Sequence, residues 1–172
     1  MALTVEDGTG LAAAESYVSV ADADTYHTAY GNPTAWSGAT TSAKEIALRE
    51  GARFLDVMFQ SKWVGQRSNE GQGLAWPRLD VTNYDGYELA STAIPVKLKD
   101  ANAIIALAAV DGTDIYPDIA ADDGPKHRAR VVVGPIEVED YFDTSSTSAT
   151  VQYRLVLDMI KEYISSGRIY RG

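Results

Sequence analysis

The chain of 172 residues is long enough to fold as one domain around a core of its own. Its 24 acidic residues outnumber its 15 basic residues, and the formal net charge of -9 argues against a protein that grips nucleic acid through clustered Lys and Arg. The lack of cysteine excludes disulfides and thiolate zinc sites, and no apolar run approaches the roughly 18 residues that cross a bilayer.

The first predicted helix begins at Ser19, which is typical of an N-cap with Asp22 three residues later. Four residues then share one apolar-aromatic face at helical spacing: Ala23, Tyr26, His27 and Tyr30. We expect His27 to be a packed or interface histidine, because no second histidine lies nearby to share a ligand. Gly31, Asn32 and Pro33 predict the end of this helix.

Residues 34–41 are small and polar, and they predict a loop anchored by Trp36. Ser42 with Glu45 three residues later forms a capping-box pattern, which predicts a second helix over residues 43–59. The small residues Gly51 and Ala52 on its apolar stripe would let a neighbouring helix approach closely.

An irregular loop follows, with about 20 residues from Gln72 onward, which is longer than most connections in a compact domain. Such a loop must be held by its own side chains or by a partner. The predicted anchors combine large apolar faces, a fixed backbone and a guanidinium able to lie over a ring: Trp63, Trp76, Pro77 and Arg78. The alternative is a stacking platform for single-stranded bases, which the overall acidity opposes.

A third helix is predicted from near Pro95 to about Val110, with Asp111 and Gly112 as its end. Beyond an acidic stretch, residues 128–133 and 136–142 predict two strands separated by Gly134 and Pro135. A strand pair alone is marginal in water, so these strands either lie on the helical core or are completed by another chain. As an arm between subunits they would use six residues: Arg128, Arg130, Val131, Val133, Ile136 and Val138.

Residues 144–150 form a predicted Ser/Thr linker, and residues 151–165 predict the last helix. The four residues that follow its Gly167 cap are basic, apolar and aromatic: Arg168, Ile169, Tyr170 and Arg171. They are interpreted either as a frayed end or as a docking tail, since Arg and Tyr are favoured anchors at interfaces.

Together these patterns predict a mainly α fold, a small bundle of about four helices with a long pinned loop and a short β-strand pair or arm. One domain is expected overall. Residues 1–112 form its helical core, residues 113–150 the β arm and linker, and residues 151–172 a helix and tail that pack on the core.

Catalytic motifs are missing from the sequence. His27 and His127 lie in neither a nucleophile-elbow nor a zinc-protease context, and the acidic run from Asp111 to Asp123 lacks the spacing of a calcium loop. The glycines at 71 and 73 lack the third glycine of a dinucleotide site. We therefore expect no enzyme, no cofactor and no metal. The N-terminus lacks a signal peptide's features, which predicts a chain made in a cytoplasm.

Five segments in this order resemble a known family: Asp7-Gly8-Thr9-Gly10, Ser16-Tyr17-Val18-Ser19, Trp63-Val64-Gly65-Gln66-Arg67, Gln72-Gly73-Leu74-Ala75-Trp76-Pro77-Arg78 and Ile94-Pro95-Val96-Lys97. The chain resembles the head–tail connector (adaptor, or head-completion) proteins of tailed bacteriophages, members of which are often labelled DnaT-like single-stranded-DNA-binding proteins. The resemblance covers residues 3–110, and the Leu-Ala-Trp-Pro-Arg run is its most specific part. Residues 111–125 and the last helix match least.

The resemblance implies a structural virion protein that forms a homo-oligomeric ring, commonly of about twelve copies, in the neck between portal and tail. Implied partners are the portal protein and a tail terminator, stopper or other neck protein, with residues 168–171 as a portal-docking tail. Genomic double-stranded DNA would pass through the ring without specific binding, and no membrane is involved. The alternative is a DnaT-like single-stranded-DNA-binding replication protein, suggested by the label and by the three tryptophans.

Overall fold

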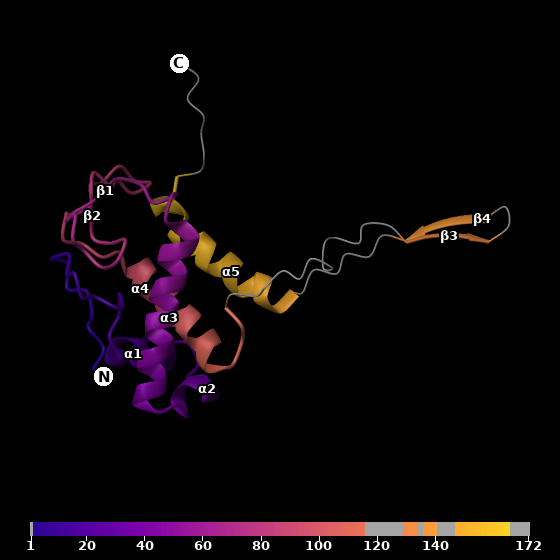
Figure 1. Ribbon diagram of the computed structural model, residues 1–172, viewed down its shortest axis with the longest axis horizontal. Helices are drawn as coiled ribbons and strands as arrows, with labels where there is room; N and C mark the ends of the chain where they lie inside the picture. The colour runs from indigo at the N-terminus through magenta and orange to yellow at the C-terminus, as the bar shows by residue number, and fades with distance from the viewer. Residues whose placement is uncertain (1, 116–128, 134–135, 141–146, 166–172) are drawn as a thin grey trace, which may run out of the picture.

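The computed structural model describes residues 2–115, 129–133, 136–140 and 147–165 (Figure 1). In chain order the helices are α1 (Val20–Ala29), α2 (Thr34–Ser37), α3 (Thr41–Phe59), α4 (Val96–Val110) and α5 (Thr147–Ile160), followed by the 3₁₀ turn η1 (Lys161–Tyr163). The strands are β1 (Gln66–Arg67), β2 (Arg78–Leu79), β3 (Ala129–Val133) and β4 (Ile136–Asp140). The mainly helical class with a short strand pair is confirmed. The described residues hold five helices, and the unexpected one is α2, which lies where a loop was predicted.

Helix α4 lies at the centre of the bundle and packs against each of the other four helices (Figure 1). It is apolar nearly all round, as expected for a helix with neighbours on several sides, and Leu98, Ala101 and Ile105 are fully buried. The closest approach is to α3. A Cβ built on Gly51 would lie 2.9 Å from the backbone oxygen of Asn102, so only glycine fits at this crossing. The predicted packing role of Gly51 is confirmed.

Asn102 is a fully buried polar residue in the middle of α4. Its Oδ1 accepts hydrogen bonds from Ser16 Oγ (3.0 Å) and from the Tyr17 backbone N–H (3.1 Å), and its Nδ2 donates to the Leu48 carbonyl (3.1 Å). One side chain therefore joins α4 to α3 and to the N-terminal segment. Because a buried amide without partners is costly, these bonds help to select one packing of the three segments.

The ends of the helices match the predictions unevenly. Ser19 caps α1 as predicted, because its side chain accepts from the Asp22 N–H. Helix α3 was predicted to be capped by Ser42, which is wrong: Thr40 is the N-cap, with extended backbone (ψ 155°) and its Oγ1 accepting from the Ala43 N–H at 3.2 Å. A cap residue must have this non-helical geometry, and Ser42 already lies inside the helix.

The predicted Ser/Thr linker over residues 144–150 is also corrected, because residues 147–150 form the first turn of α5. A turn of weak helix formers is tolerated when the rest of the helix packs well, and Val156 and Ile160 of α5 are almost fully buried. The α-helix ends at Ile160 rather than near residue 165, since η1 tightens the chain before Ile164 becomes extended.

Two short antiparallel strand pairs complete the described structure. β1 pairs with β2 in the connection between α3 and α4, with Arg67 opposite Arg78. β3 pairs with β4 as predicted, with Val131 opposite Val138 and Val133 opposite Ile136. Within the described ranges, neither β3 nor β4 packs extensively against a helix, and the hairpin stands apart from the bundle (Figure 1). Among the helices within the described ranges, none combines the length and the apolar character needed to cross a membrane.

Candidate functional site

The chain around Trp63 and Trp76 turns its large side chains into the core. Trp76 and Pro77 are fully buried, Trp63 is 7% exposed, and the indoles of the two tryptophans pack edge to face with centroids 5.9 Å apart. Tyr163 of η1 covers the other side of Trp76 at 5.5 Å. A base that stacks needs an accessible aromatic face. These two indoles are occupied by core contacts and offer none.

Arg78 holds the loop through hydrogen bonds to backbone carbonyls rather than by lying over a ring. Its Nε donates to Val64 O (2.6 Å), its Nη2 to Gly65 O (2.7 Å) and its Nη1 to Ala75 O (3.1 Å). Burial lowers the pKa of this guanidinium, because the charged form loses contact with water. The arginine of the Leu-Ala-Trp-Pro-Arg run therefore serves the fold and is not available to a phosphate.

Gln72 closes the same loop from the other end. The buried amide donates from Nε2 to Leu74 O (2.8 Å) and to Pro77 O (3.1 Å), while its Oε1 accepts from the Asn69 N–H (2.9 Å). Gly73 beside it lies so close to the N-terminal segment that a Cβ there would come within 2.8 Å of the Ala12 oxygen. The run from Gln72 to Arg78 is thus a set of anchors for irregular backbone.

The Asp7-Gly8-Thr9-Gly10 segment wraps around a buried carboxylate that the sequence analysis did not single out. Glu6 accepts hydrogen bonds from the backbone N–H groups of Gly8 (3.0 Å), Gly10 (2.8 Å) and Leu11 (2.9 Å). Converging backbone N–H groups of this kind can cradle a phosphate when they are free. Here the protein's own carboxylate fills them, so the glycines form a structural turn.

A second missed carboxylate, Asp56, lies at the junction of α3 and the loop. Its Oδ1 accepts from the buried Tyr17 hydroxyl, and its Oδ2 accepts from the Ala75 N–H at 2.9 Å. Burial raises the pKa of Asp56 to about 6 despite these bonds, which favour the ionised form. Burial and the neighbouring Asp56 carboxylate raise the pKa of Tyr17 well above its usual value.

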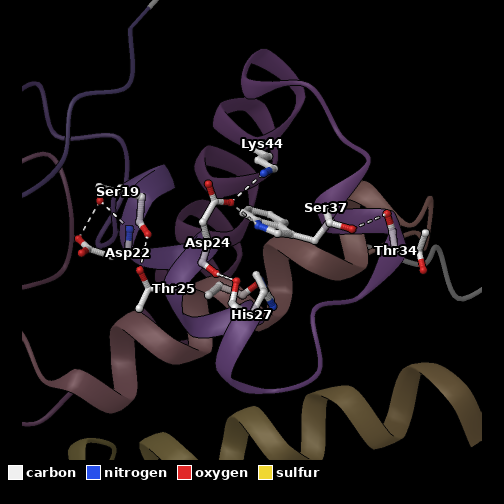
Figure 2. Close-up of polar contacts among 12 residues, drawn as sticks. Ser19, Asp22, Asp24, Thr25, His27, Thr34, Ser37 and Lys44 are labelled. Carbon is white, nitrogen blue, oxygen red and sulfur yellow. Dashed lines mark hydrogen bonds and ion pairs between the residues drawn. The ribbon is translucent and has the colours of Figure 1, made fainter.

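The cluster around α1 and α2 is built on Asp24 (Figure 2). Asp24 Oδ1 accepts from Lys44 Nζ (2.8 Å) and from Trp36 Nε1 (2.7 Å). Burial acts to raise the pKa of Asp24, but the bonds from Lys44 and Trp36 outweigh it and lower the pKa. His27 is buried beside Trp36, with ring centroids 4.5 Å apart and its Nε2 3.2 Å from the Ala103 oxygen.

This environment explains what His27 can do. Burial lowers the pKa of His27, so the neutral imidazole is favoured at pH 7. The ring is enclosed by α1, α2 and α4, as expected for a packing histidine. Across the described ranges, no three His, Asp or Glu side chains gather in a way that could hold a metal ion.

The remaining candidate residues fall in two places. The backbone of the predicted arm residues Arg130, Val131, Val133, Ile136 and Val138 lies in β3 and β4. Arg128 and the tail residues Arg168, Ile169, Tyr170 and Arg171 lie outside the described residues.

Exposed aromatic side chains are found elsewhere, on Tyr30 (73%), Tyr84 (70%) and Tyr87 (73%). Tyr84 and Tyr87 flank a turn that Asn83 closes, since its Oδ1 accepts from the N–H groups of Asp85 (3.1 Å) and Tyr87 (2.9 Å). Acidic residues share this loop, and the nearby Lys97 is paired with Glu162 at 2.6 Å. Among the described residues, Tyr84 and Tyr87 therefore do not border the basic groove that single-stranded nucleic acid needs.

Comparison with known proteins places the chain in a family. A family model described as "Putative DnaT-like ssDNA binding protein" matches residues 1–172. The chain belongs to this family. Searches of curated proteins and of solved structures give no match. The family description names binding of single-stranded DNA, and it gives no support to the resemblance to head–tail connectors.

Proposed function

We propose that the chain is a structural subunit of the head–tail connector of a tailed bacteriophage, assembled as a ring between portal and tail. The observation that carries this proposal is the hairpin β3–β4. An isolated strand pair is marginal in water, and, as far as the described residues go, this one does not pack extensively on the helices of its own chain. Another chain is therefore the natural partner for the hairpin, as in a ring of repeated subunits.

The charge of the chain supports a passive role toward DNA. With a formal net charge of -9, a ring of copies would surround a passing duplex with an acidic wall that repels it. The aromatic and guanidinium groups of Trp63, Trp76 and Arg78 are committed to the core. Such a subunit would shape a channel without holding its contents, and it needs no catalytic group.

The second candidate function is binding of single-stranded DNA in replication, which the family description favours. The exposed rings of Tyr30, Tyr84 and Tyr87 are the aromatic groups that such a protein could offer to bases. Against it stand the acidic surroundings of Tyr84 and Tyr87 and the net charge of the whole chain.

Two measurements decide between these functions. For the connector, cryo-EM of the chain mixed with its cognate portal protein should give an annular layer of subunits at the portal. For the alternative, a labelled oligonucleotide titrated with the chain should give binding that weakens steeply with salt, because counterion release drives such complexes. Tight, salt-sensitive binding together with no layer at the portal would overturn the connector.

A further inference from the structure

One face of α3 is left uncovered by the residues that the structure describes. Ile46, Glu50, Arg53 and Val57 recur at intervals of four, three and four residues, so they form a single stripe, which we call the α3 ridge. All four are exposed, and the apolar pair is conspicuous, with Ile46 at 52% and Val57 at 56%. A ridge with an apolar residue at each end and opposite charges between them suits a protein partner.

The surface beside the α3 ridge is hollowed at both ends. A hollow of about 660 Å³ lies between α2, α3 and the end of α4, and Ile46 and Glu50 line it. A second hollow of about 390 Å³ lies between α3 and the loop, lined by Arg53 and Val57. Side chains of an approaching helix can therefore settle beside the ridge, as ridges-into-grooves packing requires.

Helix α5 carries a matching stripe. Arg154, Leu157 and Asp158 of α5 lie at positions i, i+3 and i+4, and Lys161 follows them at the start of the 3₁₀ turn η1. All four are exposed, Lys161 Nζ lies 3.8 Å from Asp158 Oδ1, and we call the four residues the α5 ridge. Val156 and Ile160 bury the opposite side of α5 in the core. Both α3 and α5 pack against α4 and, among the described residues, not extensively against each other, so the two ridges are separate surfaces of one subunit.

We propose that the α3 ridge of one subunit docks on the α5 ridge of a second copy of this chain. The charges are complementary: Arg53 meets Asp158 whether the two helices run parallel or antiparallel. Glu50 then meets Arg154 in the parallel case and Lys161 in the antiparallel case. Leu157 packs toward Val57, the nearer apolar end of the α3 ridge, because Asp158 beside it lies opposite Arg53. Two different faces in contact make a head-to-tail interface, which closes into a ring when the rotation allows. The inference rests on the proposed function and names the subunit contact it requires.

A charge swap tests this contact. Self-association of the full chain is followed by sedimentation velocity over a concentration series. Arg53→Glu and Asp158→Arg should each weaken association at least about tenfold, because each sets like charges against one another. The double variant should restore it. Arg67→Glu, an equal charge reversal on the exposed strand β1, is the matched control and should associate like the original chain.

Melting curves verify that each variant stays folded, which is expected because both side chains are exposed. A chain that stays monomeric at every concentration, single variants that associate normally, or a double variant that is not rescued would each overturn the inference. The portal experiment keeps the two proposals apart. If the annular layer forms at the portal and the charge-swap variants do not change it, the connector function is supported and the proposed subunit contact is overturned. If the chain forms an oligomer that depends on the Arg53–Asp158 pair but gives no layer at the portal, the subunit contact stands and the connector function is contradicted.

Discussion

The loop between α3 and α4 has an irregular backbone that is fixed by buried side chains. The hairpin β3–β4 has a regular backbone but, among the described residues, few contacts with the helical bundle. The loop has almost no regular structure, with two-residue strands, yet its anchors Gln72, Trp76 and Arg78 are buried, and Gln72 and Arg78 donate hydrogen bonds to its backbone. The hairpin has regular five-residue strands in a simple register, yet its extensive contacts are within itself. Backbone geometry therefore does not reveal which segment the fold depends on; side-chain contacts with the core do.

This difference has a functional reading within the proposed role. A segment whose side chains are used up inside the subunit can only maintain shape, as with Arg78 and Gln72. A strand pair that makes no extensive contact with its own core, as holds for β3–β4 within the described ranges, leaves main-chain edge groups for another chain. The predictions below separate these two kinds of segment, beginning with the largest expected effect.

Arg78→Met should destabilise the chain by about 3 kcal/mol or more, because three carbonyl acceptors lose a donor that the apolar side chain cannot replace. Arg67→Met is the matched control, since Arg67 pairs directly across from Arg78 but is exposed. The control should change the free energy of unfolding by no more than about 0.5 kcal/mol. Urea unfolding followed by circular dichroism measures both, and equal effects would contradict the anchoring role of Arg78.

The sequence could predict the large anchors of the loop but not the buried polar groups that join other segments of the fold. Trp76 stands out in any sequence because of its size and its neighbours. Asn102 looks like an ordinary polar residue of a helix, and its partners at Ser16 and Leu48 are 86 and 54 positions away. Glu6 left a weak signal in the sequence, because it is an acidic residue just before a Gly-x-Gly turn. That pattern can be interpreted only once the turn is known to close on the Glu6 carboxylate.

Helix boundaries show the same limit at short range. Thr40 and Ser42 are both good N-cap residues, and propensity cannot choose between them. The choice depends on where α2 ends and on how Trp36 docks against α1, which tertiary contacts decide. The periodic patterns of α3 and α4 were sufficient for the bundle itself, because buried stripes of this length have few other interpretations.

Asp56→Asn should flatten the pH dependence of stability between about pH 4 and pH 6. The pKa of Asp56 is raised in the fold to about 6 from 3.8, so the folded chain binds the proton more tightly than the unfolded chain in this window. The stabilisation from Asp56 is fully present below the pKa that this group has in the unfolded chain. It is lost, by up to about 3 kcal/mol, as the pH rises through the pKa that Asp56 has in the folded chain. The variant should lose this fall.

The measurement is urea unfolding at a series of pH values for Asp56→Asn, with Glu50→Gln as an exposed-carboxyl control. The difference between each variant and the original chain isolates one group from the other carboxylates. A difference for Asp56→Asn that is flat with pH would show that Tyr17 and Ala75 stabilise the ionised form as strongly as burial opposes it.

The smallest effect on stability is expected from the most regular strands. Replacing residues 129–140 by a Gly/Ser linker should change the free energy of unfolding by less than about 0.5 kcal/mol, because no extensive contact between the hairpin and the helices is lost. The same change should abolish the annular layer at the portal if the hairpin is completed by a neighbouring chain. A loss of stability comparable to that of Arg78→Met would mean that the hairpin belongs to the core of its own subunit. An unchanged layer would mean that the ring is held by other faces, and the hairpin would then give no support to the connector.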